Sequence, residues 1–272
     1  MENLIVLVSG GRSSAMMARH IQTSYKYNNY NRVYVFCNTG LERPETIDFL
    51  KNMVNYWNLD LICVEGVYCE EPNIGVKHRV VSIENLDMTG KIFTGAIKQM
   101  NKYKDIGVPN QAVPYCSDYL KTRVSHDFCR HFFNGEKYIK AIGYRLEDIP
   151  RRVTINEIIN DTNRIAPLLT DFQRPVSKFD LTNFFNLQPF QLMIKSSLGN
   201  CEMCWKKSDK LLIENLKYGT RFISWYNNLE LKYGNRFFRD YKSINDLVNL
   251  SGSSNQLDLF NEDFEDKCVC SF

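Results

Sequence analysis

The amino-acid sequence predicts an α/β fold, in which a doubly wound, mainly parallel sheet is followed by a helical C-terminal part and a cysteine-bearing tail. Short apolar runs alternate with helical patterns up to Arg152, which implies parallel pairing and right-handed crossovers. The first apolar run stops at Gly10 and Gly11 and gives way to small hydroxyl residues, as at a turn from strand to helix. Beyond Arg152 the alternation fades, and aromatic-rich helical stretches such as LTNFFNLQPFQLMI dominate.

The individual elements follow from the spacing of apolar residues. Strands are expected at Leu4–Val8, Val33–Cys37, Leu61–Val64 and Tyr138–Ile142. Helices are expected at Ala15–Ile21, Pro44–Trp57 and Tyr119–Phe133. Pro44 followed by Glu45 indicates a helix start, because proline fits the first turn and an acidic side chain suits the positive end of the helix dipole.

The less regular segments set the predicted domain boundaries. Residues 66–115 are interpreted as loops with a short helix near Phe93–Met100, and residues 251–266 are polar and acidic, as in a mobile tail. The expected divisions are an α/β domain at 1–175, a helical region at 176–250 and a polar tail at 251–272.

Composition and charge exclude several classes of protein. The 34 basic and 31 acidic residues give a formal net charge of +3, which excludes a uniformly basic nucleic-acid-binding surface but not a local basic groove. No segment approaches the roughly 20 apolar residues of a membrane span, and we identify no signal peptide at the N-terminus. We therefore expect a cytoplasmic protein that does not contact a membrane. In a reducing cytosol, closely spaced cysteines indicate metal or redox chemistry rather than disulfides.

The loop SGGRSSA, which follows the first strand, has the features of an anion site. Ligands of open α/β sheets bind beyond the carboxyl ends of the strands, and Gly10 and Gly11 permit close approach to the backbone. Backbone N–H groups at the next helix start and the hydroxyls of Ser9, Ser13 and Ser14 suit phosphate. An ordinary strand-to-helix turn has a similar sequence, so the loop alone does not decide between a phosphate site and a simple turn.

Two further segments reach the same edge of the predicted sheet. NTGLERPET follows the second strand, although its first residues are also common in caps and turns. GYRLEDIPRR follows the late strand, and taken alone a solvated charged loop is its commoner interpretation. This segment carries arginines that can bind phosphate in a bidentate manner, namely Arg145, Arg151 and Arg152.

Five segments, in this order, resemble the phosphoadenylyl-sulfate (PAPS) reductase family of the adenine-nucleotide α-hydrolase, or PP-loop, superfamily. SGGRSSA resembles its pyrophosphate loop S-G-G-x-x-S, and NTGLERPET resembles N-T-G-x-x-x-x-E-T. PYCSDYLKTR resembles the Cys-Ser/Thr-x-x-Leu-Lys segment, and GYRLEDIPRR resembles G-x-R-x-x-E-x-x-R-R. GNCEMCWKKS resembles the G-N-C-x-x-C-aromatic-x-K segment of reductase-like proteins of phages and bacteria. The match runs from Ser9 to about Ser208, and five ordered motifs are far more specific than one.

The resemblance implies a Rossmann-like sheet of the HUP type, in which residues 1–175 bind ATP or an adenylyl sulfate. The residues implied for nucleotide contacts are Ser9, Gly10, Gly11, Arg12, Ser13, Ser14, Asn38, Thr39, Gly40 and Glu45. The cations implied for catalysis are Lys121, Arg145 and Arg152. Displacement at an α-phosphate develops charge on phosphate oxygens, which fixed cations and backbone N–H groups stabilise.

One position of the loop departs from the superfamily pattern. ATP pyrophosphatases of this superfamily usually have S-G-G-x-D-S, whose aspartate helps to place Mg²⁺, whereas this chain has Ser13 there. Glu42, Glu45 and Glu147 are candidate substitutes, and the sequence does not choose among them. The change lowers the support for ATP cleavage and raises the support for reductase-like chemistry, which needs no magnesium step.

The cysteines predict a metal or cluster site. Cys201 and Cys204 have C-x-x-C spacing, at which two thiolates share a metal, but this is half of a site. Cys268 and Cys270 form a second close pair, which supplies a candidate fourth ligand. Four thiolates bind zinc or an iron–sulfur cluster, and a metal-free C-x-x-C beside a disordered tail is the alternative.

The resemblance adds Cys116 to this ligand set and favours a 4Fe-4S cluster over zinc. Adenylyl-sulfate reductases have a cysteine pair where this chain has Tyr115 and Cys116. The DNA phosphorothioation protein of the same superfamily, with one upstream cysteine, fits better.

Three functions compete. The first and preferred is an adenylate-using enzyme that activates an acceptor, which is a nucleic acid or a small molecule, and inserts sulfur with the help of a redox or sulfur-donor protein. The second is a true adenylyl-sulfate reductase that releases sulfite, although the chain lacks the Glu-Cys-Gly-Leu-His end of assimilatory reductases. The third is a non-catalytic nucleotide-binding module with structural zinc.

Overall fold

The computed structural model describes residues 1–69, 75–103 and 105–253. Within these ranges the sheet has six strands in the order β4-β3-β2-β1-β5-β6. The strands are β1 (Glu2–Val8), β2 (Tyr30–Asn38), β3 (Leu61–Val67), β4 (Lys77–Val81), β5 (Tyr138–Ala141) and β6 (Arg164–Ile165). Neighbouring strands are parallel except at the β3–β4 pair. The predicted α/β class and mostly parallel sheet are confirmed, and the architecture is compatible with a Rossmann-like fold.

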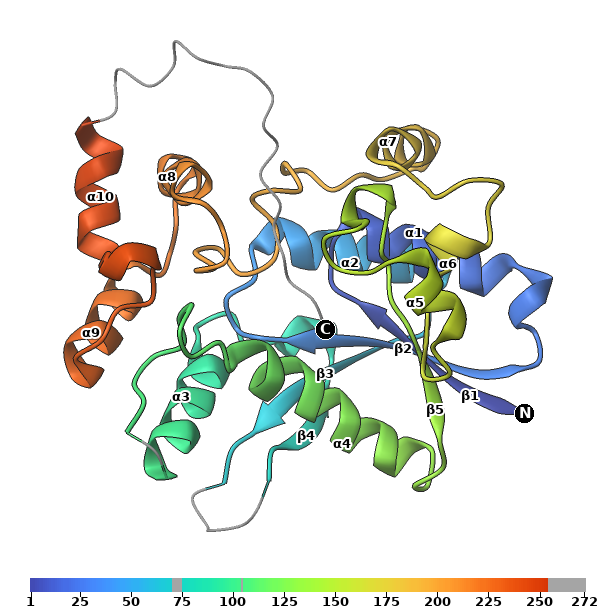
Figure 1. Ribbon diagram of the computed structural model, residues 1–272, viewed down its shortest axis with the longest axis horizontal. Coiled ribbons are helices and arrows are strands. Elements are labelled where there is room, and N and C mark those ends of the chain that lie inside the picture. Colours follow the sequence, from blue (N-terminus) through green and yellow to red (C-terminus); the bar gives the residue numbers. More distant parts are fainter. Residues whose placement is uncertain (70–74, 104, 254–272) are drawn as a thin grey trace.

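Helices cover both faces of this sheet. They are α1 (Arg12–Thr23), α2 (Pro44–Trp57), α3 (Lys91–Tyr103), α4 (Arg123–Phe132), α5 (Ile155–Asn160), α6 (Pro167–Thr170), α7 (Lys178–Asn186), α8 (Asp209–Tyr218), α9 (Ile223–Tyr233) and α10 (Ile244–Ser253). In Figure 1, α1, α2 and α7 lie on one side of the sheet and α4 on the other, while α8, α9 and α10 form a group beside it. Among the described residues, no helix is both long and apolar enough to cross a membrane.

The central strand β1 shows why its sequence is continuously apolar. Side chains alternate between the two faces of a strand, so Leu4 and Val6 pack into the core beneath α1 and α2. Ile5 and Leu7 pack into the core beneath α4. Because helices cover both faces, every residue of β1 after the exposed Glu2 is buried, and Leu4–Val8 form an uninterrupted apolar run.

The predicted strands and helices are present with small changes in their bounds. The helix predicted at Pro44–Trp57 has these same limits, because the proline begins the first turn. The segment predicted as one helix at Tyr119–Phe133 begins instead with a π-helical turn, η3 (Asp118–Thr122), before α4.

Three predictions of local structure were wrong. The interpretation of 66–115 as loops missed β4, because this edge strand begins Lys-His-Arg and lacks an apolar run. The very short β6 was also missed. Within LTNFFNLQPFQLMI the helix ends at Asn186, since Pro189 cannot donate a backbone hydrogen bond and disfavours helical geometry before it.

Candidate functional site

The three segments predicted to meet at the sheet edge do lie together. Gly143, just after β5, packs so closely on α1 that a Cβ there would lie 3.0 Å from the Ser14 backbone. Gly10 lies against Thr46 of α2, whose methyl group a Cβ on Gly10 would meet in a severe clash. The loop after β1 is therefore held between the segments that follow β2 and β5.

Hydrogen bonds from serines fix the shape of this loop. The Ser14 hydroxyl accepts from the backbone N–H of Ser9 at 3.0 Å and donates to the Gly11 carbonyl at 3.0 Å. Within the described ranges, no side chain caps the start of α1, and its first turn contains no acidic residue. The side chains of this first turn thus do not neutralise the positive end of the helix dipole, and anion binding there stays a prediction.

Arg12 and Ser13 begin α1, at the predicted anion site. A guanidinium N–H of Arg12 donates to the Leu192 carbonyl at 3.4 Å, and burial lowers the pKa of this arginine. Its Nε is buried and has no hydrogen-bond partner among the residues that the structure describes. Its role in nucleotide binding stays a prediction.

The side chains of Asn38 and Thr39 organise the turn after β2. The Asn38 amide donates to Glu65 Oε1 at 2.7 Å and to the Asp87 carbonyl at 2.9 Å, and its oxygen accepts from the Gly40 N–H at 3.0 Å. Thr39 donates its hydroxyl proton to Glu42 at 2.7 Å. Any contact of this turn with a nucleotide therefore comes from a backbone that these buried side chains hold in place.

Glu45 lies on the first turn of α2 and receives a hydrogen bond from the Tyr218 hydroxyl at 2.9 Å. Its second oxygen is buried and has no partner within the described parts of the chain. Two other glutamates are candidate substitutes for the missing aspartate. The buried Glu42 accepts a hydrogen bond from the Thr39 N–H, and Glu147 accepts one from the Lys178 N–H at 2.8 Å. The geometry does not single out one of them as a magnesium ligand.

The two predicted catalytic arginines flank one buried carboxylate, Asp148. Arg145 Nε lies 3.6 Å from Asp148 Oδ2, and Arg152 Nε lies 3.4 Å from Asp148 Oδ1. Asp148 also accepts from the Arg145 backbone N–H at 2.9 Å, so it fixes the turn that carries the arginines. Sequence reasoning did not identify this partner. The intervening Arg151 is exposed.

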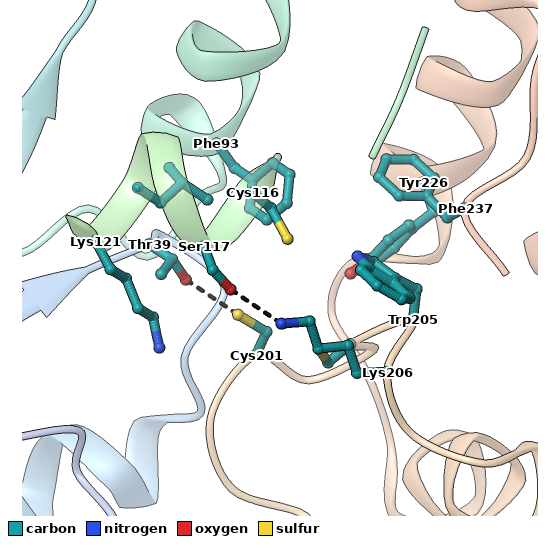
Figure 2. A pocket seen from close by; sticks show the side chains of 12 residues that line it. Thr39, Phe93, Cys116, Ser117, Lys121, Cys201, Trp205, Lys206, Tyr226 and Phe237 are labelled. Atoms are coloured by element: carbon teal, nitrogen blue, oxygen red, sulfur yellow. Dashed lines mark hydrogen bonds between the residues drawn. The ribbon is translucent and has the colours of Figure 1, made fainter. Parts of the chain in front are cut away.

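A pocket brings Cys116, Cys201 and Cys204 together, as predicted (Figure 2). These cysteines are 9%, 7% and 8% exposed, respectively. The other residues that line the pocket are Thr39, Phe93, Ser117, Leu120, Lys121, Trp205, Lys206, Tyr226 and Phe237. All three thiols lie near the Tyr226 phenol. Burial is the main cause that raises the pKa of this phenol, and electrostatic repulsion from the three cysteines raises it further.

The loop that carries Cys201 and Cys204 is anchored to the turn after β2. The Glu202 N–H donates to the Leu41 carbonyl at 2.9 Å, and Cys201 pairs with Glu42 in an antiparallel bridge. The fully buried Lys207 donates to the Cys201 and Glu202 carbonyls at 3.2 Å each. The Lys207 ammonium group therefore satisfies two loop carbonyls that no helix or strand hydrogen bond of the described residues satisfies.

Two hydrogen bonds cross the pocket in Figure 2. Cys201 Sγ lies 3.2 Å from Thr39 Oγ1, and Lys206 Nζ donates to Ser117 Oγ at 3.2 Å. Because the Thr39 hydroxyl proton is given to Glu42, the Cys201 sulfur is the donor in the first contact when it is a thiol. Burial raises the pKa of Glu42, and the bond from Thr39 opposes this effect.

The donor set of the pocket fits a thiophilic metal group. Soft thiolates bind zinc and iron–sulfur clusters in preference to hard cations, and the buried Lys121 offsets part of their negative charge. The pocket contributes three cysteines from two distant segments, so a four-ligand site needs one more. The predicted ligands Cys268 and Cys270 lie outside the described residues.

A second cluster joins His78 of β4 to Asp127 and His131 of α4, and their ligand atoms lie within 4.8 Å of one another. The Asp127 carboxylate lies 2.7 Å from His78 Nδ1 and 3.9 Å from His131 Nδ1. Lys77 and Arg130 lie 3.4 Å and 3.6 Å from the same carboxylate. Since two cations already balance its charge, this cluster is explained as an ion-pair network.

Comparison with known proteins relates the chain to a phage protein. The chain is 29% identical over 206 residues to ORF290, an uncharacterized nin region protein of Escherichia phage lambda. The match covers 75% of this chain and 66% of the relative, which is just under two thirds of the relative's length. No family model matches the chain, and no solved structure matches it.

Proposed function

We propose that this protein is a PAPS-reductase-like, PP-loop enzyme of sulfur chemistry that binds ATP or an adenylyl sulfate at the β1–α1 loop. The observation that supports this most strongly is the position of Thr39. It belongs to the turn after β2, at the edge where nucleotides bind in such sheets, and it also lines the cysteine pocket and contacts Cys201. The predicted nucleotide site and the predicted sulfur site thus share a wall.

The chain's own residues suit charge stabilisation at a phosphate. The N–H groups at the start of α1 would bind the phosphates, while Lys121, Arg145 and Arg152 would stabilise charge that develops on their oxygens. In the preferred reaction, an acceptor oxygen attacks the α-phosphate of ATP and pyrophosphate leaves. A sulfur nucleophile then displaces AMP from the activated acceptor. The acceptor is a nucleic acid or a small molecule.

The cysteine pocket is the proposed site of a 4Fe-4S cluster. Cys116, Cys201 and Cys204 would hold it, and when bound it would supply a place to carry sulfur or electrons. Lys206 and Ser117 close one side of the pocket through their hydrogen bond, which keeps the two cysteine-bearing segments together.

Anaerobic purification followed by iron, sulfide and zinc analysis and an absorption spectrum tests the cluster. We expect about four iron and four sulfide per chain with visible absorption. Zinc without visible absorption would instead support the structural-zinc module. Incubation with ATP and a candidate acceptor should release pyrophosphate, whereas sulfite release from an adenylyl sulfate would support the true reductase.

A further inference from the structure

Trp205 carries a buried hydrogen-bond donor whose acceptor the described chain does not supply. Of the chain's three tryptophans, Trp57 donates to Gln188 at 3.0 Å and Trp225 donates to Thr94 Oγ1 at 2.9 Å. Trp205 is 8% exposed, and its indole nitrogen is buried with no partner among the described residues. A buried N–H without an acceptor destabilises the folded protein, so native proteins rarely contain one.

The place of Trp205 indicates what the missing acceptor is. The indole lies on the wall of the cysteine pocket that faces Thr39 and Lys121 (Figure 2). Three further aromatic side chains line the same pocket, and Lys206 Nζ lies 5.5 Å from the centroid of the Trp205 ring. The pocket is also lined by thiols, which makes sulfur the acceptor that its chemistry favours.

We propose that the Trp205 Nε1–H donates a hydrogen bond to a sulfur atom of the iron–sulfur group in this pocket, either a sulfide or a coordinating thiolate. This inference rests on the proposed function, because that group provides the acceptor. Trp205 is then a positioning residue that also sets the reduction potential. Reduction adds negative charge to the cluster, so a hydrogen bond to sulfur stabilises the reduced form more and raises the potential.

The variant Trp205→Phe keeps an aromatic ring and removes only the N–H. Trp225→Phe is its matched control, since Trp225 packs in the same core but its N–H is bound to Thr94. Both variants and the wild type are purified without oxygen, and iron, sulfide and the reduction midpoint are measured. We expect unchanged iron in Trp205→Phe and a more negative midpoint, with about a fivefold lower reduced-to-oxidised ratio at fixed potential. Trp225→Phe should leave the midpoint unchanged.

A measurement on the wild type covers the case in which Trp205→Phe loses its iron. With ¹⁵N in the indole groups, one of the three N–H signals should couple to the paramagnetic cluster, whereas Trp57 should be unaffected. Absence of that coupling, or an unmoved midpoint in an iron-loaded Trp205→Phe variant, would overturn this inference and leave the proposed cluster standing. A wild-type chain without iron and sulfide would overturn both.

Discussion

Gly10 and Gly11 are adjacent in the loop after β1, yet different constraints act on them. Gly10 has a φ of +75° and lies against Thr46, so the fold requires glycine there. Gly11 has a φ of −99°, which any residue adopts, and a Cβ on it would meet only Ser9 Oγ at 3.6 Å. The protein itself therefore does not require glycine at position 11, which is consistent with close approach by a ligand.

This difference predicts that Gly11→Ala weakens nucleotide binding and leaves the fold stable. Loss of a charge-assisted contact to phosphate should reduce affinity by about 10- to 150-fold, measured by calorimetry with ATP. Gly10→Ala is the contrasting variant, and it should lower the melting temperature because of its positive φ and its clash with Thr46. Equal ATP affinity in Gly11→Ala and wild type would exclude the loop as the phosphate site.

Arg145 should serve the bound anion rather than only the turn that contains it. Asp148 balances part of the charge of Arg145, but the hydrogen bond that the Arg145 backbone N–H donates to Asp148 remains when the arginine side chain is removed. We expect Arg145→Ala to weaken nucleotide binding about 10- to 150-fold with a small change in melting temperature. The exposed Arg151 provides the control, and Arg151→Ala should bind normally. A fall in melting temperature with unchanged affinity would make Arg145 structural.

Asp171, which follows α6, connects this short helix to the end of α1 and the turn after it. It accepts from His20 Nε2 at 3.0 Å, Lys26 Nζ at 2.6 Å and the Tyr27 hydroxyl at 2.6 Å. Burial alone would raise the pKa of Asp171, but these hydrogen bonds outweigh it and hold the pKa well below its ordinary value. The folded state therefore favours the ionised carboxylate.

A carboxylate with a lowered pKa stabilises the fold above its unfolded pKa of about 3.9. That contribution is lost as the pH falls through the folded value. We expect Asp171→Asn to reduce the free energy of unfolding at pH 7 by about 1–3 kcal/mol, and the difference from wild type to shrink below about pH 4. Urea unfolding at the two pH values measures this. A difference that stays constant with pH would show that packing, not ionisation, causes the loss.

The elements that sequence could predict are those whose own residues decide their structure. Helices cover both faces of β1, so a continuous apolar run in the sequence indicates this buried strand. The start of α2 is indicated by its proline. β4 is held by its pairing with β3 and by ion pairs such as Arg79–Glu65, which its own charged residues do not reveal. Position in the sheet, rather than local pattern, forms that strand.

The same distinction applies to the candidate site. The cysteines and the arginines stand in motifs, so their convergence could be predicted from the order of five segments. Asp148 as the partner of both arginines, and Trp205 as an unpaired donor, could not be predicted. Their roles depend on which atoms the packing of distant segments brings into reach, and a single sequence does not contain that information.

Two parts of the chain meet at the cysteine pocket. Thr39 and Lys121 come from the sheet and its π-helical turn, whereas Cys201 and Cys204 come from the segment that precedes α8. Arg43 also joins these parts, because its buried guanidinium donates to the Leu198 carbonyl at 3.2 Å and to Asn215 Oδ1 at 3.1 Å. A group bound by all three pocket cysteines would add a covalent connection at this junction.

Removal of the C-terminal tail tests whether the tail completes this metal site. Three pocket cysteines leave a four-ligand site one short, and the sequence offers Cys268 and Cys270 beyond Glu265. A bond to the metal would offset the conformational entropy lost when a polar segment becomes ordered. We expect truncation after Glu265 and the variant Cys204→Ser each to lose metal when purified without oxygen. The amount of iron or zinc per chain is the readout.

The control is Cys63→Ser, which alters a buried cysteine beneath α2 and should retain metal. If Cys204→Ser loses metal while the truncated chain keeps its full complement, the tail supplies no ligand. Cys268 and Cys270 would then be available as thiol nucleophiles, and the reductase would become the better-supported function.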